Sequence, residues 1–311
     1  MRGPVDKGKN GLGGQLRKCP LAQTNVLFIL PAIIIMMIIT AFPFLNALWM
    51  SLQNYVISMP FDRGFVGLKN YATVMSDPKL WSSVKVTMAF AVSVVLIETI
   101  LGTILALCLL RLGEKRNASG YVSVLIVPMT ISPVAVGLIW RMLLHPDLGV
   151  INYVLDVVGI GGRAWLGDPS TALGTLIVVD AWQWTPFMML IIYAALLGLP
   201  KEPYEAAHLD GANWFQTFSQ ITVPLAKPML LTAILFRFVD ALKAYDLVYI
   251  LTGGGPGTAT ETLSYYIYKL GFTYLDMGKG SAVSFMFLVV IGVLATFVSN
   301  HIGEDGMQGI A

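Results

Sequence analysis

Between two long apolar runs the chain reads Glu205-Ala206-Ala207-His208-Leu209-Asp210-Gly211-Ala212 and, shortly afterwards, Ile221-Thr222-Val223-Pro224. Residues 202–209 are mostly good helix formers, and a proline stands near their start. Gly211 permits a turn that other residues resist, and residues 213–221 can form a second short helix. The sequence therefore predicts a helical hairpin in a polar loop of about residues 200–228.

The spacing of this segment, E-A-A, three residues, G, nine residues and I-x-x-P, resembles the signature loop of the membrane subunits of binding-protein-dependent ABC importers. One position departs from the family pattern: Val223 stands where leucine is usual. The resemblance implies a cytoplasmic loop that docks in a cleft of a separate ATPase subunit, with Glu205 facing a basic residue there. The alternative is an amphipathic loop on the membrane surface. The residues expected to dock are Glu205, Ala206, Ala207, Asp210 and Gly211.

The composition indicates a membrane protein. Apolar residues make up 56% of the chain and charged residues 12%, about half the charge of an ordinary soluble domain, and the mean hydropathy is +0.72. A net charge of +2 gives no reason to expect a nucleic-acid partner. The two cysteines, Cys19 and Cys108, form no disulfide or metal pattern.

Six segments are apolar and long enough, at roughly 20 residues, to cross a bilayer. All six are expected to be helical, because lipid offers the backbone no hydrogen-bond partners. Asp180 and Pro186 interrupt the fourth. The segments are 26–50, 84–110, 121–144, 172–198, 229–251 and 281–302.

Basic residues before the first span indicate its orientation. The tail carries Arg2, Lys7, Lys9, Arg17 and Lys18 against one acid, Asp6, which favours a cytoplasmic N-terminus. An even number of crossings then returns the C-terminus to the same side. We expect an all-α membrane protein of six transmembrane helices with the ABC importer permease fold, comprising a flexible cytoplasmic tail, 1–24, and a transmembrane domain, 25–311.

Nucleotide-binding signatures are absent from the sequence. It contains neither a G-x-x-x-x-G-K-[ST] phosphate loop nor a Rossmann glycine fingerprint. We therefore expect no ATP site, cofactor, metal or catalytic residue in this chain, with ATP and Mg²⁺ bound by the partner ATPase.

Two predicted outer loops carry further resemblances. Residues 67–71, with Asp77-Pro78, resemble the first periplasmic loop of the family. The run Leu251-Thr252-Gly253-Gly254-Gly255-Pro256 resembles the carbohydrate branch, which includes the maltose, trehalose, polyol and glycerol-phosphate permeases. The second resemblance implies a substrate of the sugar class.

The fifth apolar segment carries four ionisable residues, each three positions after the last. That spacing puts neighbours on nearly one face of a helix, with alternating signs. Ionisable residues at membrane depth are costly, so each is a functional hypothesis. We predict a face that lines the substrate pathway, and the alternative is a self-neutralising stripe that only packs against another helix. The residues are Arg237, Asp240, Lys243 and Asp246.

The fourth segment contains aromatic rings beside an amide, the combination with which proteins hold sugars. Its W-x-x-x-P-F portion resembles the family pattern, and Pro186 is expected to kink the helix. The alternative is an interfacial tryptophan belt. For Glu98 two interpretations stay open, namely pairing with a cation in the bundle interior or a transient contact during gating. The predicted pathway residues here are Trp182, Gln183, Trp184 and Phe187.

Taken together, the resemblances imply a permease subunit of a carbohydrate ABC importer in a bacterial cytoplasmic membrane. It would pair with a second, homologous permease subunit and two ATPase subunits, receive sugar from an extracytoplasmic binding protein, and work by alternating access. An ion-coupled secondary carrier is the alternative, suggested by Glu98 and Asp180, although no internal repeat supports it. A third interpretation, an integral membrane enzyme, would need a clustered His, Cys or Ser site, which the sequence lacks. Whether the sugar is neutral or anionic stays open.

Overall fold

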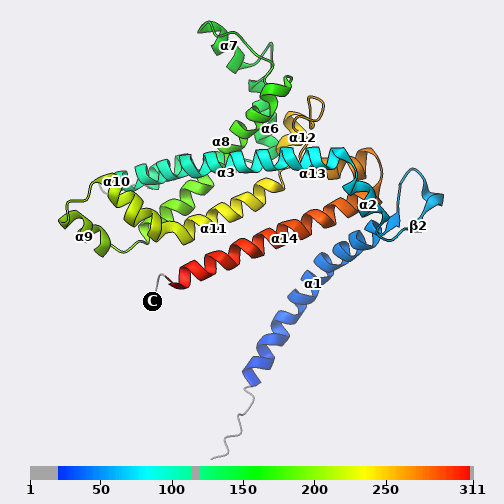
Figure 1. The fold of residues 1–311 in the computed structure, drawn as a ribbon, viewed down its shortest axis with the longest axis horizontal. Coiled ribbons are helices and arrows are strands. Elements are labelled where there is room, and N and C mark those ends of the chain that lie inside the picture. Colours follow the sequence, from blue (N-terminus) through cyan, green and yellow to red (C-terminus); the bar gives the residue numbers. More distant parts are fainter. Residues whose placement is uncertain (1–19, 114–118, 309–311) are drawn as a thin grey trace, which may run out of the picture. The chain divides into compact units, whose positions relative to one another are not determined.

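The computed structural model describes residues 20–113 and 119–308, which are predominantly helical (Figure 1). The only strands in the described part are β1 (Gln53–Asn54) and β2 (Gly64–Phe65), an antiparallel pair with Gln53 opposite Phe65. The α-helices are α1 (Pro20–Ser51), α2 (Lys69–Met75), α3 (Pro78–Gly113), α4 (Ser119–Leu125), α5 (Val127–Thr130), α6 (Pro133–Leu143), α7 (Val150–Val157), α8 (Pro169–Leu197), α9 (Glu202–Leu209), α10 (Trp214–Thr217), α11 (Val223–Leu242), α12 (Asp246–Leu251), α13 (Leu263–Tyr268) and α14 (Met277–Gln308). A 3-10 helix, η1 (Pro60–Asp62), and two π-helical turns, η2 (Phe218–Thr222) and η3 (Lys269–Thr273), complete the elements.

The chain forms two compact units, residues 1–49 and 50–311. The first unit contains most of α1, a helix that is apolar on all sides, as expected of a membrane span. This helix begins at Pro20, earlier than the predicted start of the first span, and the remainder of the predicted tail, 1–19, lies outside the described residues.

Five helical stretches in the described residues are long and apolar enough to cross a membrane. They correspond to the predicted spans one, two, four, five and six, and α8 runs through Pro186 without a break. At the start of α8, Asp168 accepts a hydrogen bond from the backbone N–H of Ser170 at 2.8 Å. That bond, with another from the Ser170 hydroxyl, holds the pKa of Asp168 below its ordinary value. The five stretches are Ile29–Ser51, Pro78–Leu112, Pro169–Leu197, Trp214–Leu242 and Met277–Phe297.

The third apolar segment differs from the prediction of one continuous helix over 121–144, which is wrong. It forms three short helices, α4, α5 and α6. Pro128 and Pro133 stand in the first turns of α5 and α6, and Ile131 and Ser132 are extended between them. A proline cannot donate a backbone hydrogen bond and is tolerated in the first turn of a helix, so Pro128 and Pro133 each mark the start of a new short helix.

The fifth apolar segment is also broken, and the prediction of a continuous helix over 229–251 is wrong. The helix α11 ends at Leu242, Lys243 caps it, and α12 begins at Asp246. The Thr262 hydroxyl donates a hydrogen bond of 2.9 Å to the Ala244 carbonyl oxygen. The side chain of Thr262, the N-cap residue of α13, therefore satisfies a carbonyl that α11 leaves without an intrahelical partner.

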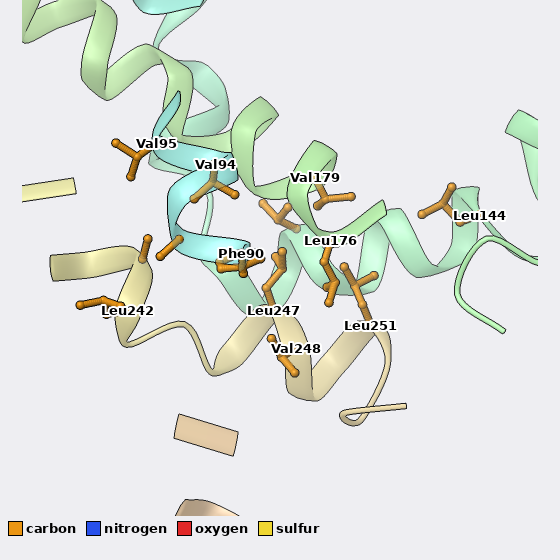
Figure 2. Packing of buried hydrophobic residues seen from close by; sticks show 13 residues of the cluster. Phe90, Val94, Val95, Leu144, Leu176, Val179, Leu242, Leu247, Val248 and Leu251 are labelled. Atoms are coloured by element: carbon orange, nitrogen blue, oxygen red, sulfur yellow. The ribbon is translucent and has the colours of Figure 1, made fainter. Parts of the chain in front are cut away.

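The core of the second unit is centred on the contact between α3 and α8. Gly102 allows their close approach, because a Cβ on it would lie 2.9 Å from both the Met188 Cβ and the Met189 backbone nitrogen. Toward the other end of the pair, buried side chains of α3, α8 and α12, including Phe90, Leu176 and Val248, pack together (Figure 2). This packing holds α12 and the end of α11 against α3 and α8.

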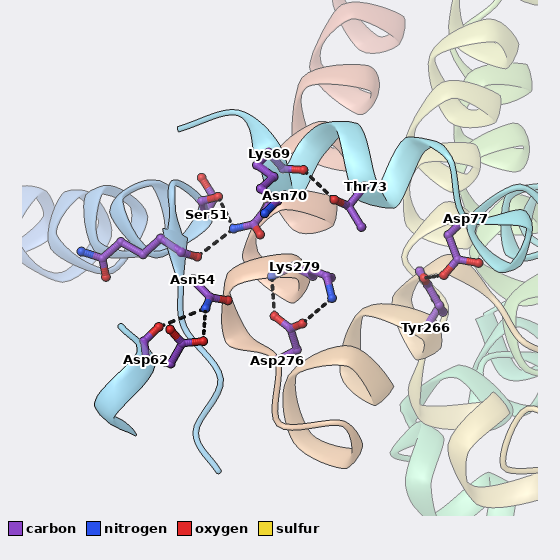
Figure 3. A network of polar contacts seen from close by, with 11 residues as sticks. Ser51, Asn54, Asp62, Lys69, Asn70, Thr73, Asp77, Tyr266, Asp276 and Lys279 are labelled. Atoms are coloured by element: carbon purple, nitrogen blue, oxygen red, sulfur yellow. Dashed lines mark hydrogen bonds and ion pairs between the residues drawn. The ribbon is translucent and has the colours of Figure 1, made fainter. Parts of the chain in front are cut away.

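Polar contacts hold the first predicted outer loop together and join it to the second, which the sequence places on the same side of the membrane (Figure 3). The Asn70 amide donates to the carbonyl oxygens of Ser51 and Gln53, each at 2.8 Å. The Tyr266 hydroxyl donates to Asp77 at 2.9 Å, and burial together with this bond raises the pKa of Tyr266. Since both loops gather at the N-terminal end of α3, the fold is consistent with their predicted placement on one side.

Candidate functional site

A cavity of about 190 Å³ opens where α8, α11 and α12 meet. Six of the eight predicted pathway residues line it, although they come from three helices and one connecting segment. Those six are Gln183, Trp184, Arg237, Asp240, Lys243 and Asp246, and the other lining residues are Pro133, Asp180, Ala241, Ala244, Tyr245 and Leu247. The break after α11 therefore keeps the predicted residues together by folding α12 back beside the cavity.

Arg237 is the centre of the cavity wall and is 2% exposed. Its Nε and Nη2 donate to the two carboxylate oxygens of Glu98 at 2.7 and 2.9 Å. Nη2 also pairs with Asp180, and Nη1 donates to Asp240 at 3.1 Å. All three guanidinium nitrogens are thus engaged by carboxylates, which are supplied by α3, α8 and α11 itself.

Burial explains why these groups must pair. A charge removed from water is stable only when partners and hydrogen bonds replace its hydration. Glu98 is completely buried, and its bidentate contact with Arg237 confirms the interpretation that it pairs with a cation in the bundle interior. The face of Trp184 covers the same guanidinium, with the Arg237 Cζ 5.4 Å from the ring centroid, a distance suited to a cation–π contact.

Gln183 offers a free acceptor in the cavity wall. Its amide nitrogen donates to the Ile131 carbonyl oxygen at 2.9 Å, so the extended residue between α5 and α6 fixes its orientation. Its side-chain oxygen is buried and has no hydrogen-bond partner among the described residues. A buried oxygen left in this way is costly unless a ligand hydroxyl or water donates to it.

Two predicted pathway residues do not line the cavity. Trp182 is 43% exposed, and its ring meets the edge of Trp140 on α6 at a centroid distance of 5.6 Å. Phe187 packs against a buried cluster of α3, α8 and α11 that contains Leu109 and Met188, and its ring meets that of Trp184 edge-on at a centroid distance of 6.3 Å. Trp182 faces away because it lies two residues after Asp180, about 200° around the helix.

The second predicted site is the hairpin of residues 201–222. As predicted, α9 spans Glu202–Leu209 and Gly211 adopts the left-handed conformation, with φ +75°. Glu205 and Ala206 are exposed, whereas Ala207 is 7% exposed and packs inside the hairpin. A hollow of about 460 Å³ runs along it, and its lining includes Ala206, Ala207, Asp210 and Gly211.

Local hydrogen bonds hold the hairpin in shape. Asn213 and Gln216 form a reciprocal capping box that starts α10. The Tyr204 hydroxyl donates to the Thr222 hydroxyl at 3.1 Å, which joins α9 to the turn before α11. The second predicted helix is confirmed as α10 followed by a π-helical turn, and this turn continues directly into α11.

Within the described ranges, no group of three or more His, Cys, Asp or Glu residues is placed to hold a metal ion. The charged groups of the cavity are instead arranged around the guanidinium of Arg237.

Apolar helices of membrane-spanning length around a charged cavity define a multi-pass integral membrane protein. Residues 98–304 match the family model described as "Binding-protein-dependent transport system inner membrane component". The chain belongs to this family, the permease subunits of ABC importers.

Individual relatives agree with this assignment. The trehalose/maltose transport system permease protein MalF of Thermococcus litoralis is 36% identical over 87% of this chain and 90% of its own length. The sn-glycerol-3-phosphate transport system permease protein UgpA of Agrobacterium fabrum is 31% identical over 87% of this chain and 92% of its own length.

A solved structure shows the same fold. One chain from the crystal structure of a bacterial ABC transporter involved in the import of the acidic polysaccharide alginate superposes with a TM-score of 0.79. It shares 21% sequence identity, and the match covers 92% of this chain and 96% of that one.

Proposed function

We propose that this subunit moves a sugar or sugar derivative across the cytoplasmic membrane by alternating access, driven by ATP that a separate subunit hydrolyses. The assembly would comprise a second, homologous permease subunit, two ATPase subunits and an extracytoplasmic binding protein. The names of the relatives support the sugar class, because they include trehalose, maltose and sulfoquinovosyl glycerol transport systems.

One observation carries the proposal: a single helix, α11, links the hairpin to the cavity. The hairpin runs without interruption into Val223 and Pro224 at the start of α11, and Arg237 and Asp240 lie on its last turns. At 1.5 Å per residue, its 20 residues extend about 30 Å. A displacement of the hairpin by a docked ATPase would therefore be transmitted directly to the cavity wall.

The charges of the cavity support an uncharged sugar over an anionic one. Arg237 already contacts three carboxylates and has no unused guanidinium nitrogen. Lys243 is the other lining cation, and it lies on the exposed side near Asp246. The lining acids Asp180, Asp240 and Asp246 stand beside these two cations, so the cavity offers no surplus of positive charge to an anion. The free oxygen of Gln183 is also an acceptor, which suits a hydroxyl donor.

Transport by the reconstituted complex tests the proposal. Proteoliposomes that contain both permeases, the ATPases and the binding protein should take up radiolabelled trehalose or maltose, whereas uptake of sn-glycerol 3-phosphate alone would contradict an uncharged substrate. Uptake should require ATP and survive an uncoupler that collapses ion gradients. Uptake driven by an imposed ion gradient without ATP would instead establish the secondary carrier, which has no use for an ATPase-docking hairpin.

A further inference from the structure

Five aromatic rings gather beside the cavity, at the end of α11 opposite the hairpin. They pack ring against ring: Tyr268 lies 5.3 Å from Tyr245, 5.5 Å from Tyr249 and 5.3 Å from Phe272, measured between centroids. We call this group the aromatic cluster. Its members are Tyr245, Tyr249, Tyr265, Tyr268 and Phe272.

The aromatic cluster is continuous with the cavity and open to its surroundings. Tyr245 belongs to both, because its side chain also lines the cavity. Tyr249 is 44% exposed and Phe272 is 64% exposed. Tyr266 differs sharply from its neighbours in sequence: it is 1% exposed, and its hydroxyl bonds to Asp77. The fold therefore uses Tyr266 for internal packing and leaves the cluster rings accessible.

The triple-glycine loop shapes this surface. Gly254 has φ +78°, and a Cβ there would lie 2.5 Å from Cε1 of Tyr265. Only glycine lets the Tyr265 ring rest directly on the loop backbone. The loop is held by a hydrogen bond of 2.7 Å between the hydroxyls of Thr252 and Thr260. The segment that resembles the carbohydrate branch thus places the α13 tyrosines beside those of α12.

We propose that the aromatic cluster is a saccharide-binding surface at the mouth of the cavity, on which a sugar ring stacks before it passes Tyr245. This inference rests on the proposed function. Tyrosine rings offer apolar faces for the C–H side of a pyranose, and their hydroxyls can donate to or accept from sugar hydroxyls. The five rings themselves carry no formal charge, which agrees with an uncharged substrate. Lipid-facing aromatic belts anchor proteins at the interface, but here the rings cover one another and adjoin the pathway.

The number of sugar molecules transported for each ATP hydrolysed tests this assignment. In proteoliposomes of the full complex, with saturating trehalose-loaded or maltose-loaded binding protein, Tyr249→Ala and Tyr268→Ala should lower sugar uptake about three- to tenfold, the factor expected for one lost stacking contact. Stimulated ATPase activity should stay within about twofold, because the hairpin is unchanged. Tyr249→Phe keeps the ring and should retain most of the uptake. Tyr153→Ala, an exposed tyrosine of α7, is the matched control and should leave the ratio unchanged.

A pair of glycine variants tests the role of the loop. Gly254→Ala and Gly257→Ala both place a side chain on a residue with positive φ, but space is open around Gly257. Only Gly254→Ala displaces Tyr265, so only it should reduce uptake for each ATP hydrolysed.

Three results separate the possible failures. If the wild-type complex transports no sugar, the proposed function fails. If it transports sugar and the alanine variants keep the wild-type ratio, the saccharide surface is wrong while the proposed function stands. If the alanine variants lose the second permease subunit on purification, the aromatic cluster is a subunit interface, and the inference is overturned.

Discussion

The two ends of α11 are built in opposite ways. At the cavity end, Arg237 is buried and held by carboxylates from helices distant in sequence, Glu98 and Asp180. At the hairpin end, the stabilising bonds are local, as between Asn213 and Gln216, while Glu205 stays exposed. The difference teaches that long-range ion pairs hold the cavity end within the subunit, whereas the hairpin end keeps its shape by local bonds and leaves Glu205 exposed, as the proposed docking role requires. Substitutions at the two ends should therefore fail in different assays.

The largest loss of stability is expected from Arg237→Leu. It leaves Glu98 and Asp180 buried without a cation, and breaking a buried ion pair costs about 3–5 kcal/mol. The thermal unfolding midpoint in detergent should fall well below that of Arg141→Leu, the control, because Arg141 is exposed and makes a single hydrogen bond, to Ile250.

A compensated variant sharpens this test. Neutralising all three groups, in Glu98→Gln/Asp180→Asn/Arg237→Met, should recover much of the lost stability, because no unpaired charge remains. If Arg237→Leu unfolds at the temperature of Arg141→Leu, the ion-pair network does not stabilise the subunit.

An intermediate effect is expected from Gly211→Val. A β-branched residue in the left-handed region costs about 1–3 kcal/mol, and the strain should distort the hairpin without unfolding the helix bundle. The control is Gly174→Val, the same substitution in α8 at a helical position with open space around it. Co-purification of the ATPase should fall for Gly211→Val alone, and equal retention by both variants would contradict the assignment.

Charge reversal at Glu205 should hardly change the stability of the subunit but should abolish its assembly with the ATPase. Glu205→Lys and Glu202→Lys both alter exposed glutamates in the first turn, and such surface changes usually stay within about 0.5 kcal/mol. If Glu205 faces a basic residue of the ATPase, only Glu205→Lys should release that subunit on purification and lower ATP-driven uptake at least tenfold. Identical behaviour of the two variants would remove Glu205 from the docking contact.

The predicted topology places the triple-glycine loop outside and the hairpin inside the cell. Two cysteine variants, which are not expected to change the stability of the subunit, test this placement. In a background with Cys19→Ser and Cys108→Ala, Thr258→Cys in the triple-glycine loop should react with an impermeant thiol reagent in intact cells. Leu209→Cys, at 87% exposure on the hairpin, should react only after permeabilisation. The reverse labelling pattern would invert the topology and separate the hairpin from any cytoplasmic ATPase.

The hairpin was predictable because its signals are local. A proline near the start of α9, a glycine at the turn and an asparagine before α10 act within a few residues of their positions. The cavity residues were predictable as ionisable groups at membrane depth. Their partners were not, because Arg237 lies 139 positions after Glu98 and 57 after Asp180, and no spacing rule spans such distances.

The errors also have physical causes. Pro128 and Pro133 signalled the break in the third apolar segment. The prediction missed it because it relied on hydropathy, which does not identify helix breaks. The end of α11 had no comparable signal, since neither glycine nor proline occurs between Leu242 and Asp246 and the stop depends on Thr262 from another helix. The aromatic cluster was missed because its tyrosines lie on two helices that only the folded loop brings together.

The missing side chain of Gly102 restricts how α3 and α8 can move against each other, and so restricts the motions open to the proposed alternating access. It lets α3 lie against the backbone of α8, so sliding one past the other would drive the Met188 side chain into the α3 backbone. Glu98 and Asp180, carried by these two helices, should therefore keep their mutual spacing throughout the cycle. Under the proposed alternating access, we expect α11, and with it Arg237, to move against this fixed pair of acids. The exchange of those ion pairs would then form an energy barrier between the two orientations and oppose leakage when the proposed ATPase is idle.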